Sequence, residues 1–338
     1  MQQQVYNVIF TTNDAYVNYL IVLLESIFET NTEKKFCFFV LYNSLSESKK
    51  ERLTEYVSEH NAQINFLYIA GEKYKVFQLE ERFTVETYFR LEIQDLLPKD
   101  VERVLFLDTD MIVCNDLSEL YHMDFENKYL IACGFSPRCE KGDEFNAGMI
   151  LYNIKKMREN NITFETYVEL AEKLNGNFYL DQGLLNEMFG TTGTKYVWKQ
   201  KYNFTCPFYR KYREEVQKET PGFSLDDIVV LHYPGPGIRP WQACLAKEEF
   251  ERLKKNGLLD IFAMKGYIID DLYIEVLEKW WAFAKNTPVY EELLTDMFRM
   301  KSSIYEQVLL ATVNTKAYRL GNSILRIPKK VKTLLKKG

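Results

Sequence analysis

Two aspartates separated by one residue, Asp108 and Asp110, directly follow the apolar run of residues 104–107 (VLFL). At the end of a strand, carboxylates with this spacing can face one point and bind a hard divalent cation through oxygen, which leaves coordination positions for phosphate oxygens. The apolar residues 111–113 (MIV) behind them favour a pair held at the edge of a sheet. In the simpler alternative, one aspartate caps the next turn and the other is only solvated.

A histidine stands in a similar position after a second apolar run. His232 follows residues 228–231 (IVVL) and opens a segment rich in glycine and proline that reaches Arg239. A neutral imidazole can complete a metal site begun by two aspartates, and the segment behind it lets the backbone and the Arg239 guanidinium approach a diphosphate. A lone histidine is more often packed or on the surface, as we expect for His60 and His122.

The elements that must position these residues alternate between strand and helix patterns. Short β-branched or apolar runs predict strands over residues 5–11, 36–41, 64–70, 104–107 and 228–231. Helical spacing predicts helices between several of them, including one over residues 87–97. Such alternation predicts an α/β fold with a mainly parallel, doubly wound sheet and right-handed crossovers. Ligands of these sheets lie outside the carboxyl ends of the strands, so we expect the site around residues 11–14, 108–110 and from 232 onward.

Composition and glycine spacing exclude several classes of protein. With 46% hydrophobic and 27% charged residues, the chain is globular rather than disordered or fibrous. Gly71 is the first glycine, so the turn after the first strand is not G-x-G-x-x-G, and G-x-x-x-x-G-K-[ST] occurs nowhere. This argues against a nicotinamide or flavin Rossmann enzyme and against a P-loop NTPase.

Seven short segments combine the candidates above with further polar residues. In chain order they are residues 8–14 (VIFTTND), 87–91 (TYFRL), 105–110 (LFLDTD), 145–149 (FNAGM), 181–182 (DQ), 202–204 (YNF) and 232–241 (HYPGPGIRPW). In this order, from about Tyr6 to Trp241, they resemble the motifs of glycosyltransferase family 8. That family includes bacterial lipopolysaccharide galactosyl- and glucosyltransferases and glycogenin.

The resemblance implies a Rossmann-like nucleotide-diphospho-sugar transferase (GT-A) fold over residues 1–245 and a helical C-terminal region over residues 246–338. It also implies a UDP-sugar donor, a Mn²⁺ or Mg²⁺ ion and transfer with retention of anomeric configuration. The implied metal ligands are Asp108, Asp110 and His232. The implied catalytic residues are Asp181 and Gln182. The implied donor-binding residues are Thr11, Thr12, Asn13, Tyr16, Arg90, Asp108, Thr109, Asp110, Asn146, Ala147, Asp181, Gln182, His232, Gly235 and Arg239.

Taken alone, each added residue also has a structural explanation. Asn146 and Gly148 can simply form a turn, Asp181 can cap a helix, and Arg90 can lie on a helix surface. Their order along the chain favours the functional interpretation. Two routes to retention stay open: a nucleophile near the anomeric carbon, with Asp181 and Gln182 as candidates, or attack by the acceptor hydroxyl beside the leaving group.

Two positions depart from the family pattern. Arg239 precedes Pro240 and Trp241 where relatives have lysine, with one extra residue in the loop after His232, and Arg82 stands near the place of a histidine beside the sugar. Arginine can bind a phosphate through two hydrogen bonds, so Arg239 is compatible with diphosphate binding. Arg82 in place of the histidine leaves the identity of the donor sugar undecided. We expect transfer of a hexose, glucose or galactose, to a cell-surface glycan or lipopolysaccharide-type acceptor. The alternatives are a haloacid dehalogenase-like phosphatase, whose nucleophile strand also ends in D-x-D, and a non-catalytic sugar-nucleotide binding protein.

The net charge of −5, from 43 basic and 48 acidic residues, hides an asymmetry. Residues 307–338 carry eight Lys or Arg and no acidic residue, so residues 1–306 carry −13. The basic end interleaves cations with apolar residues, and we expect it to meet an anionic membrane surface unless it is only a solvated terminus. The acidic body argues against a nucleic-acid partner. Without a signal sequence or a spanning run, we expect a cytoplasmic protein, peripheral on the inner face of the cytoplasmic membrane.

Overall fold

The computed structural model of this 338-residue chain describes residues 4–77, 84–135, 144–234, 239–241, 251, 255, 270–299 and 302. The chain divides into two compact units, one of residues 1–235 with 282–287 and the other of residues 236–281 with 288–338. Four sequence predictions fall outside the described residues: the boundary after residue 245, the placement of Arg82, the donor contact of Gly235, and the basic end over residues 307–338.

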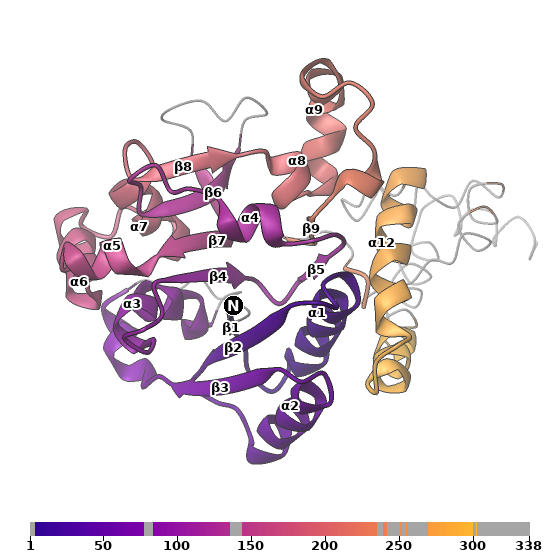
Figure 1. The fold of residues 1–338 in the computed structure, drawn as a ribbon, viewed down its shortest axis with the longest axis horizontal. Helices are drawn as coiled ribbons and strands as arrows, with labels where there is room; N and C mark the ends of the chain where they lie inside the picture. Colours follow the sequence, from indigo (N-terminus) through magenta and orange to yellow (C-terminus); the bar gives the residue numbers. More distant parts are fainter. Residues whose placement is uncertain are drawn as a thin grey trace, which may run out of the picture. The chain divides into compact units, whose positions relative to one another are not determined.

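Among the described residues, the first unit is built on a seven-stranded sheet with the order β3-β2-β1-β4-β7-β6-β8 (Figure 1). A separate two-stranded sheet pairs β5 with β9. The strands are β1 (Val5–Thr11), β2 (Lys35–Tyr42), β3 (Gln63–Tyr68), β4 (Arg103–Leu107), β5 (Met111–Val113), β6 (Leu130–Gly134), β7 (Phe145–Asn153), β8 (Thr194–Val197) and β9 (Val230–His232). Neighbours in the large sheet run parallel except β7, which is antiparallel to β4 and to β6. The prediction of a mainly parallel α/β sheet is confirmed, with one reversed strand inside it.

Helices connect these strands. The α-helices are α1 (Val17–Thr30), α2 (Glu47–Glu59), α3 (Ile93–Leu96), α4 (Ser118–His122), α5 (Ile154–Glu159), α6 (Phe164–Lys173), α7 (Leu180–Phe189), α8 (Lys199–Tyr202) and α9 (Cys206–Glu219). The 3₁₀ helices are η1 (Gly71–Val76), η2 (Val85–Glu92) and η3 (Leu225–Asp227). The helix predicted over residues 87–97 is instead η2 followed by the short α3. Every residue from Tyr88 to Glu92 is buried, so this segment lacks the solvent-facing stripe of an amphipathic α-helix.

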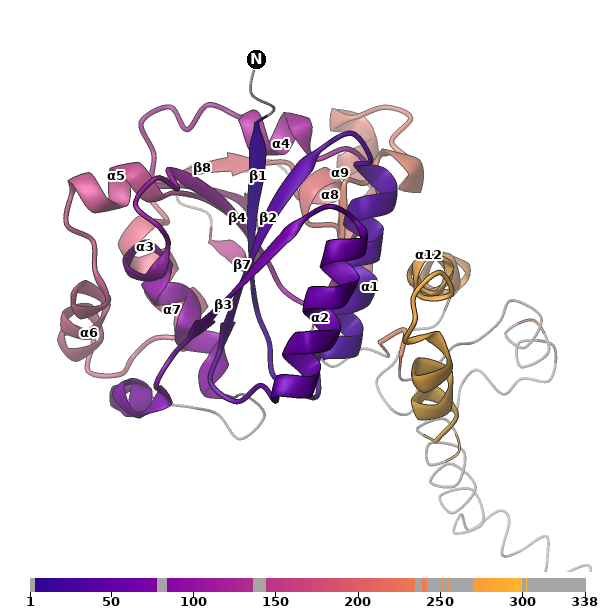
Figure 2. The ribbon, with the colours of Figure 1, turned by 60° about the horizontal axis from the view of Figure 1, so that its bottom comes forward.

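Both faces of the large sheet are covered, which explains its continuous apolar strands. Figure 2 shows α1 and α2 on one face and α3, α6 and α7 on the other. In β1, Ile9 belongs to the core cluster that also contains Phe106 of β4. The next residue, Phe10, packs with Phe38, whose ring centroid lies 5.7 Å from that of Phe28 in α1. Because both faces of the sheet are covered by apolar side chains, polar side chains lie at the ends of the strands.

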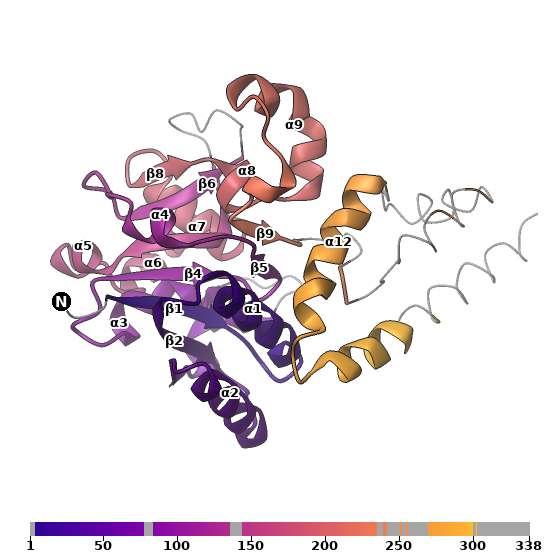
Figure 3. The same cartoon turned by 45° about the vertical axis from the view of Figure 1, so that its right-hand side comes forward.

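The small sheet joins two segments that are far apart in sequence. Its register pairs Met111 of β5 with His232 of β9, and the Tyr233 N–H donates to the Asp110 carbonyl at 2.9 Å. Figure 3 shows both strands beyond the tip of β4. The strand predicted before His232 is therefore present, but it belongs to this small sheet and not to the main one.

In the second unit, tryptophans pack around α12 (Asp271–Ala284), whose residues up to 281 belong to it. The ring centroids of Trp241 and Trp280 lie 5.5 Å apart, and Trp281 Nε1 donates to the Pro240 carbonyl at 2.9 Å. Across the described ranges, no helix combines the length and the apolar composition needed to cross a membrane.

Candidate metal centre

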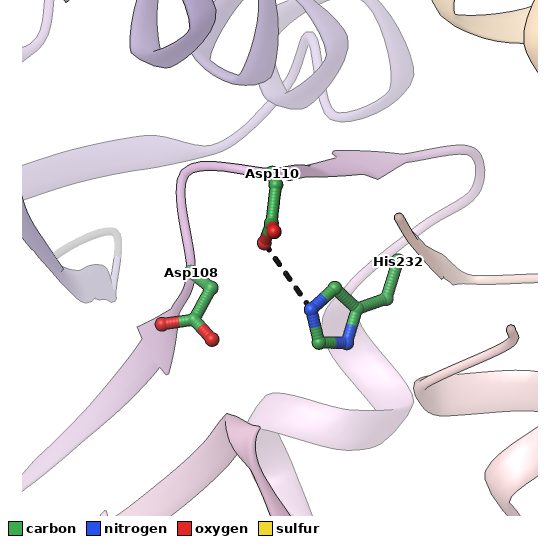
Figure 4. Close-up of side chains that lie close together, drawn as sticks. All are labelled: Asp108, Asp110 and His232. Carbon is green, nitrogen blue, oxygen red and sulfur yellow. Dashed lines mark ion pairs between the residues drawn. The ribbon is translucent and has the colours of Figure 1, made fainter. Parts of the chain in front are cut away.

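Three side chains from two distant segments converge at the carboxyl end of β4. Asp108 and Asp110 lie between β4 and β5, and His232 ends β9. One ligand atom from each of the three lies within 4.8 Å of the other two. Asp110 Oδ1 is 3.2 Å from His232 Nε2, and the Asp108 carboxylate lies beside them (Figure 4). Two carboxylates and an imidazole form a donor set suited to a divalent metal ion.

Gly148 leaves open the space that these ligands surround. Its carbonyl accepts a hydrogen bond from the Asp108 N–H at 2.9 Å, which brings β7 against the end of β4. A Cβ atom at this position would lie 2.5 Å from His232 Cε1 and 2.9 Å from Asp108 Oδ2, closer than real Cβ atoms approach their neighbours. The space between the three candidate ligands therefore has room for a metal ion, because residue 148 is a glycine and places no side chain in it.

Arg90 is the buried cation of this region. The residue is 6% exposed, and its guanidinium lies 2.9 Å from Asp108 Oδ1 and 2.8 Å from Asp181 Oδ2. Its Nη1 also donates to the Ala147 carbonyl. Burial lowers the pKa of Arg90, but the two carboxylates outweigh this effect and raise it, so the guanidinium stays charged. Arg90 is thus the counter-ion that holds both aspartates in place.

The two carboxylate oxygens of Asp108 face different groups, one facing Arg90 and the other the candidate metal centre. Its Oδ1 accepts from Arg90 Nη2, and its Oδ2 lies on the side of Gly148. Burial raises the pKa of the Asp108 carboxyl; the charge of Arg90 opposes this rise, and the neighbouring Asp110 adds to it. A cation bound between the two carboxylates would remove the repulsion between them.

The first turn of α7 carries the two residues expected to be catalytic. Asp181 is 4% exposed, and its Oδ1 accepts from Thr87 Oγ1 at 3.0 Å while its Oδ2 forms the ion pair described above. Gln182 Oε1 accepts from Asn146 Nδ2 and from the Ala147 N–H, each at 3.2 Å. These contacts join both residues, with Asn146 and Ala147, to the network around the candidate metal centre.

The end of β1 approaches the same edge of the sheet. Ile9 pairs with Phe106 in the β1–β4 register, so Thr11 and Asp108 each lie two residues beyond that pair. The Thr11 hydroxyl oxygen is buried and has no hydrogen-bond partner among the residues that the structure describes. A buried hydroxyl of this kind can be satisfied by an external ligand.

Other expected donor-binding residues occupy the same turns. Thr12 and Thr109 are both buried, the first after β1 and the second between the two aspartates. Asn13 Oδ1 accepts a backbone hydrogen bond within its own turn. Tyr16 is the N-cap residue of α1. The structure thus places these four residues in the turns that follow β1 and β4.

Two expected residues are not placed at this centre. Arg239 belongs to the second unit, where its guanidinium carbon lies 5.5 Å from the centroid of the Trp241 ring. Gly235 lies outside the described residues. Their contacts with a diphosphate stay predictions.

The structure adds two residues to which the sequence alone assigns no role. Asn203 is fully buried, with its Oδ1 2.9 Å from His232 Nδ1, and Thr87 holds Asp181 through its hydroxyl. Both residues belong to segments that resemble family motifs, 87–91 and 202–204, but the sequence gives neither side chain a partner.

The model of the family described as Glycosyl transferase family 8 matches residues 7–244, which include all three candidate metal ligands. The lipopolysaccharide 1,2-glucosyltransferase of Escherichia coli is 23% identical to this chain over 71% of it and 74% of that protein. The lipopolysaccharide 1,3-galactosyltransferase of Salmonella typhimurium is 26% identical over 66% of this chain and 68% of that protein.

Among solved structures, an active-site mutant of LgtC aligns with a TM-score of 0.60 and 26% identity, over 74% of this chain and 95% of that one. The GT-A fold implied by the sequence resemblance is thereby confirmed. Three parallel strands precede β4 in the chain, whereas the phosphatase alternative places its D-x-D on the first strand. The haloacid dehalogenase alternative is therefore set aside.

Proposed function

Since this chain belongs to glycosyl transferase family 8 and is a glycosyltransferase, we propose that it moves glucose or galactose from a UDP-sugar to a cell-surface glycan or lipopolysaccharide-type acceptor, with retention of configuration. The observation that carries the proposal is the convergence of Asp108, Asp110 and His232 around the space beside Gly148. This is the edge at which sheets of this type bind nucleotides.

The difficult charge in such a reaction develops on the departing UDP diphosphate. Asp108, Asp110 and His232 would hold a Mn²⁺ or Mg²⁺ ion, which when bound contacts phosphate oxygens and neutralises part of that charge. Arg239 adds a bidentate guanidinium for the same phosphates, and Gly235 allows close approach of the backbone.

We assign the nucleoside to the turn after β1, with Thr11, Thr12, Asn13 and Tyr16. The buried Thr11 hydroxyl oxygen supports this assignment, since it lacks a partner within the described ranges. Leaving such a group unsatisfied is unfavourable by about 1–3 kcal/mol. A hydrogen bond to the donor would restore that free energy on binding.

The contacts of Asp181 favour one of the two routes to retention. Both of its oxygens are engaged, one by Thr87 and the other by Arg90, in a residue that is 4% exposed. A carboxylate held in this way is a poor nucleophile, because attack on the anomeric carbon would leave Arg90 a partly unpaired buried charge. We therefore favour attack by the acceptor hydroxyl on the face of the leaving group, with Asp181 and Gln182 orienting the donor sugar.

Incubation with Mn²⁺ and a panel of nucleotide sugars tests the proposal through release of UDP, with water replacing the acceptor in a slow hydrolysis. We expect release from UDP-glucose or UDP-galactose and none after chelation of the metal. Release of phosphate from sugar phosphates would instead identify a phosphatase. Binding of nucleotide sugars without turnover would identify a binding protein, and either result would overturn the proposal.

We also propose that the basic end docks the protein on anionic lipid at the inner face of the cytoplasmic membrane. Residues 307–338 carry eight cations and no acidic residue, and each cation near such a surface contributes about 1 kcal/mol. Deleting the residues after Tyr318 should abolish cosedimentation with phosphatidylglycerol vesicles and leave transfer to a soluble acceptor unchanged. A full-length variant with its last five lysines replaced by glutamine controls for chain length. Undiminished vesicle binding by both proteins would contradict the proposal.

A further inference from the structure

His232 can bind a metal ion only through a ring nitrogen that carries no proton, and its two nitrogens have different surroundings. Nε2 lies 3.2 Å from Asp110 Oδ1, at the candidate metal centre, whereas Nδ1 lies 2.9 Å from Asn203 Oδ1. The histidine is 3% exposed and Asn203 is fully buried, so bulk water does not compete for these contacts. Whether Nδ1 carries a proton therefore depends on which end of the Asn203 amide faces the ring.

A backbone N–H at the start of β7 decides the direction of that amide. The Gly148 N–H lies 3.1 Å from the Asn146 side chain, and because a backbone N–H can only donate, the atom that it meets is the oxygen Oδ1. The Asn203 atom that faces this same oxygen at 2.9 Å must then be Nδ2. Its Oδ1 is left to face His232, and an acceptor at that position requires the ring proton on Nδ1.

A second backbone N–H independently fixes the same orientation of the Asn146 side-chain amide. The Ala147 N–H lies 3.2 Å from the Gln182 side chain, so the atom there is Oε1. The Asn146 atom 3.2 Å from that oxygen must be Nδ2, which is the orientation already required by Gly148. Turning any one amide over would place two donors or two acceptors against each other, so the chain of hydrogen bonds has one direction.

We propose that Asn203 is a positioning residue that, through Asn146 and the N–H groups of Ala147 and Gly148, holds His232 protonated on Nδ1 and leaves the Nε2 lone pair for the metal ion. The metal-binding part of this inference rests on the proposed function, but the proton on Nδ1 is a property of the protein without metal. A ring that moved its proton to Nε2 would point an N–H toward Asp110 and offer no ligand to a cation.

Long-range ¹H–¹⁵N correlation spectra of the metal-free, full-length protein measure the tautomer directly. The chain has three histidines, so replacing His60 and His122 singly by asparagine assigns every ring signal. We expect a proton on Nδ1 of His232, whether or not the neighbouring Asp110 carboxylate also keeps a proton on Nε2 in the absence of metal. A ring with no proton on Nδ1, or one that averages between both tautomers, would overturn the proposal.

Two substitutions of Asn203 separate positioning from packing. Asn203→Asp keeps an oxygen to accept from Nδ1 and loses only the donation to Asn146 Oδ1, whereas Asn203→Leu approximates the shape and removes both the acceptor and the donor. We expect calorimetric titration with Mn²⁺ to show a 10–100-fold weaker affinity for Asn203→Leu, with loss of the Nδ1–H signal, and a smaller loss of affinity with the Nδ1–H signal kept for Asn203→Asp. A residue needed only for packing would show the reverse order, because burying a carboxylate is less favourable than burying a leucine.

Asn153→Leu is the matched control. Asn153 is a half-buried amide at the opposite end of β7, where it contacts the Lys128 carbonyl and the Lys156 N–H. Its replacement should leave the His232 signals and the Mn²⁺ affinity unchanged. If the native protein bound no Mn²⁺, the proposed function would fail while the ring spectrum would still decide the tautomer. Should Asn203→Leu not fold, the native spectrum decides alone.

Discussion

Asp108→Asn is expected to slow sugar transfer by about 100-fold or more while leaving the fold intact. Arg90 Nη2 donates to Asp108 Oδ1 at 2.9 Å, so the new amide must turn its oxygen toward Arg90. Its NH₂ group then points to the side of Gly148 and the metal centre. A hydrogen-bond donor would occupy the position of a cation ligand. Titration with Mn²⁺ and initial rates at saturating UDP-sugar measure both consequences.

Glu102→Gln is the matched control for this substitution. Glu102 immediately precedes β4, as Asp108 immediately follows it, and it is an exposed residue paired with Lys155 at 3.3 Å. Its replacement removes the same charge from the other end of the strand and should leave the rate unchanged, because exposed ion pairs contribute little. Full metal-dependent transfer by Asp108→Asn would refute the assignment of the D-x-D pair as metal ligands.

Gly148→Ala is expected to weaken the same site through one added methyl group. The added carbon would lie 2.5 Å from His232 Cε1 and 2.8 Å from Met111 Cε. The ring is held at Nδ1 by Asn203, so it cannot move away freely. Overpacking of this kind destabilises a core by about 1–3 kcal/mol. We expect Mn²⁺ affinity to fall at least about 10-fold, with a parallel loss of transfer and a lower melting temperature.

Gly71→Ala is the corresponding control, since its added carbon would meet only the side chains of Asn43 and Val85, the nearest at 3.3 Å. It should keep both metal affinity and activity. The losses from Gly148→Ala and His232→Ala should not add in the double variant, because the first substitution already displaces the ring that the second removes. Additive losses would show that the methyl group acts elsewhere.

The D-x-D pair was predictable because its position depends on local properties of the sequence. A continuous apolar run is typical of a strand covered on both faces, and polar residues directly after it can only lie at the end of the strand. The structure ends β4 at Leu107, immediately before Asp108. The same reasoning places Thr11 at the end of β1. Strand ends of a covered sheet are therefore the part of this site that the sequence predicts well.

Contacts between distant segments were not predictable in this way. His232 lies beside Asp110 because β9 pairs with β5, and nothing in residues 228–231 distinguishes a strand of the small sheet from one of the main sheet. The burial of Arg90 is similar, because the sequence alone left open a position on a helix surface, whereas η2 is buried around this residue. In both cases tertiary packing overrides the local pattern.

The pairing of Met111 with His232 also bears on the order in which the chain folds. Contacts between distant segments form late, because the intervening loop must close, at an entropic penalty, before the contact stabilises anything. A nascent chain that ends short of residue 232 carries the two carboxylate ligands, Asp108 and Asp110, and lacks the imidazole. The complete ligand set therefore exists only after β9 has been synthesised and has paired with β5, so a bound cation would mark a first unit in which both sheets have formed.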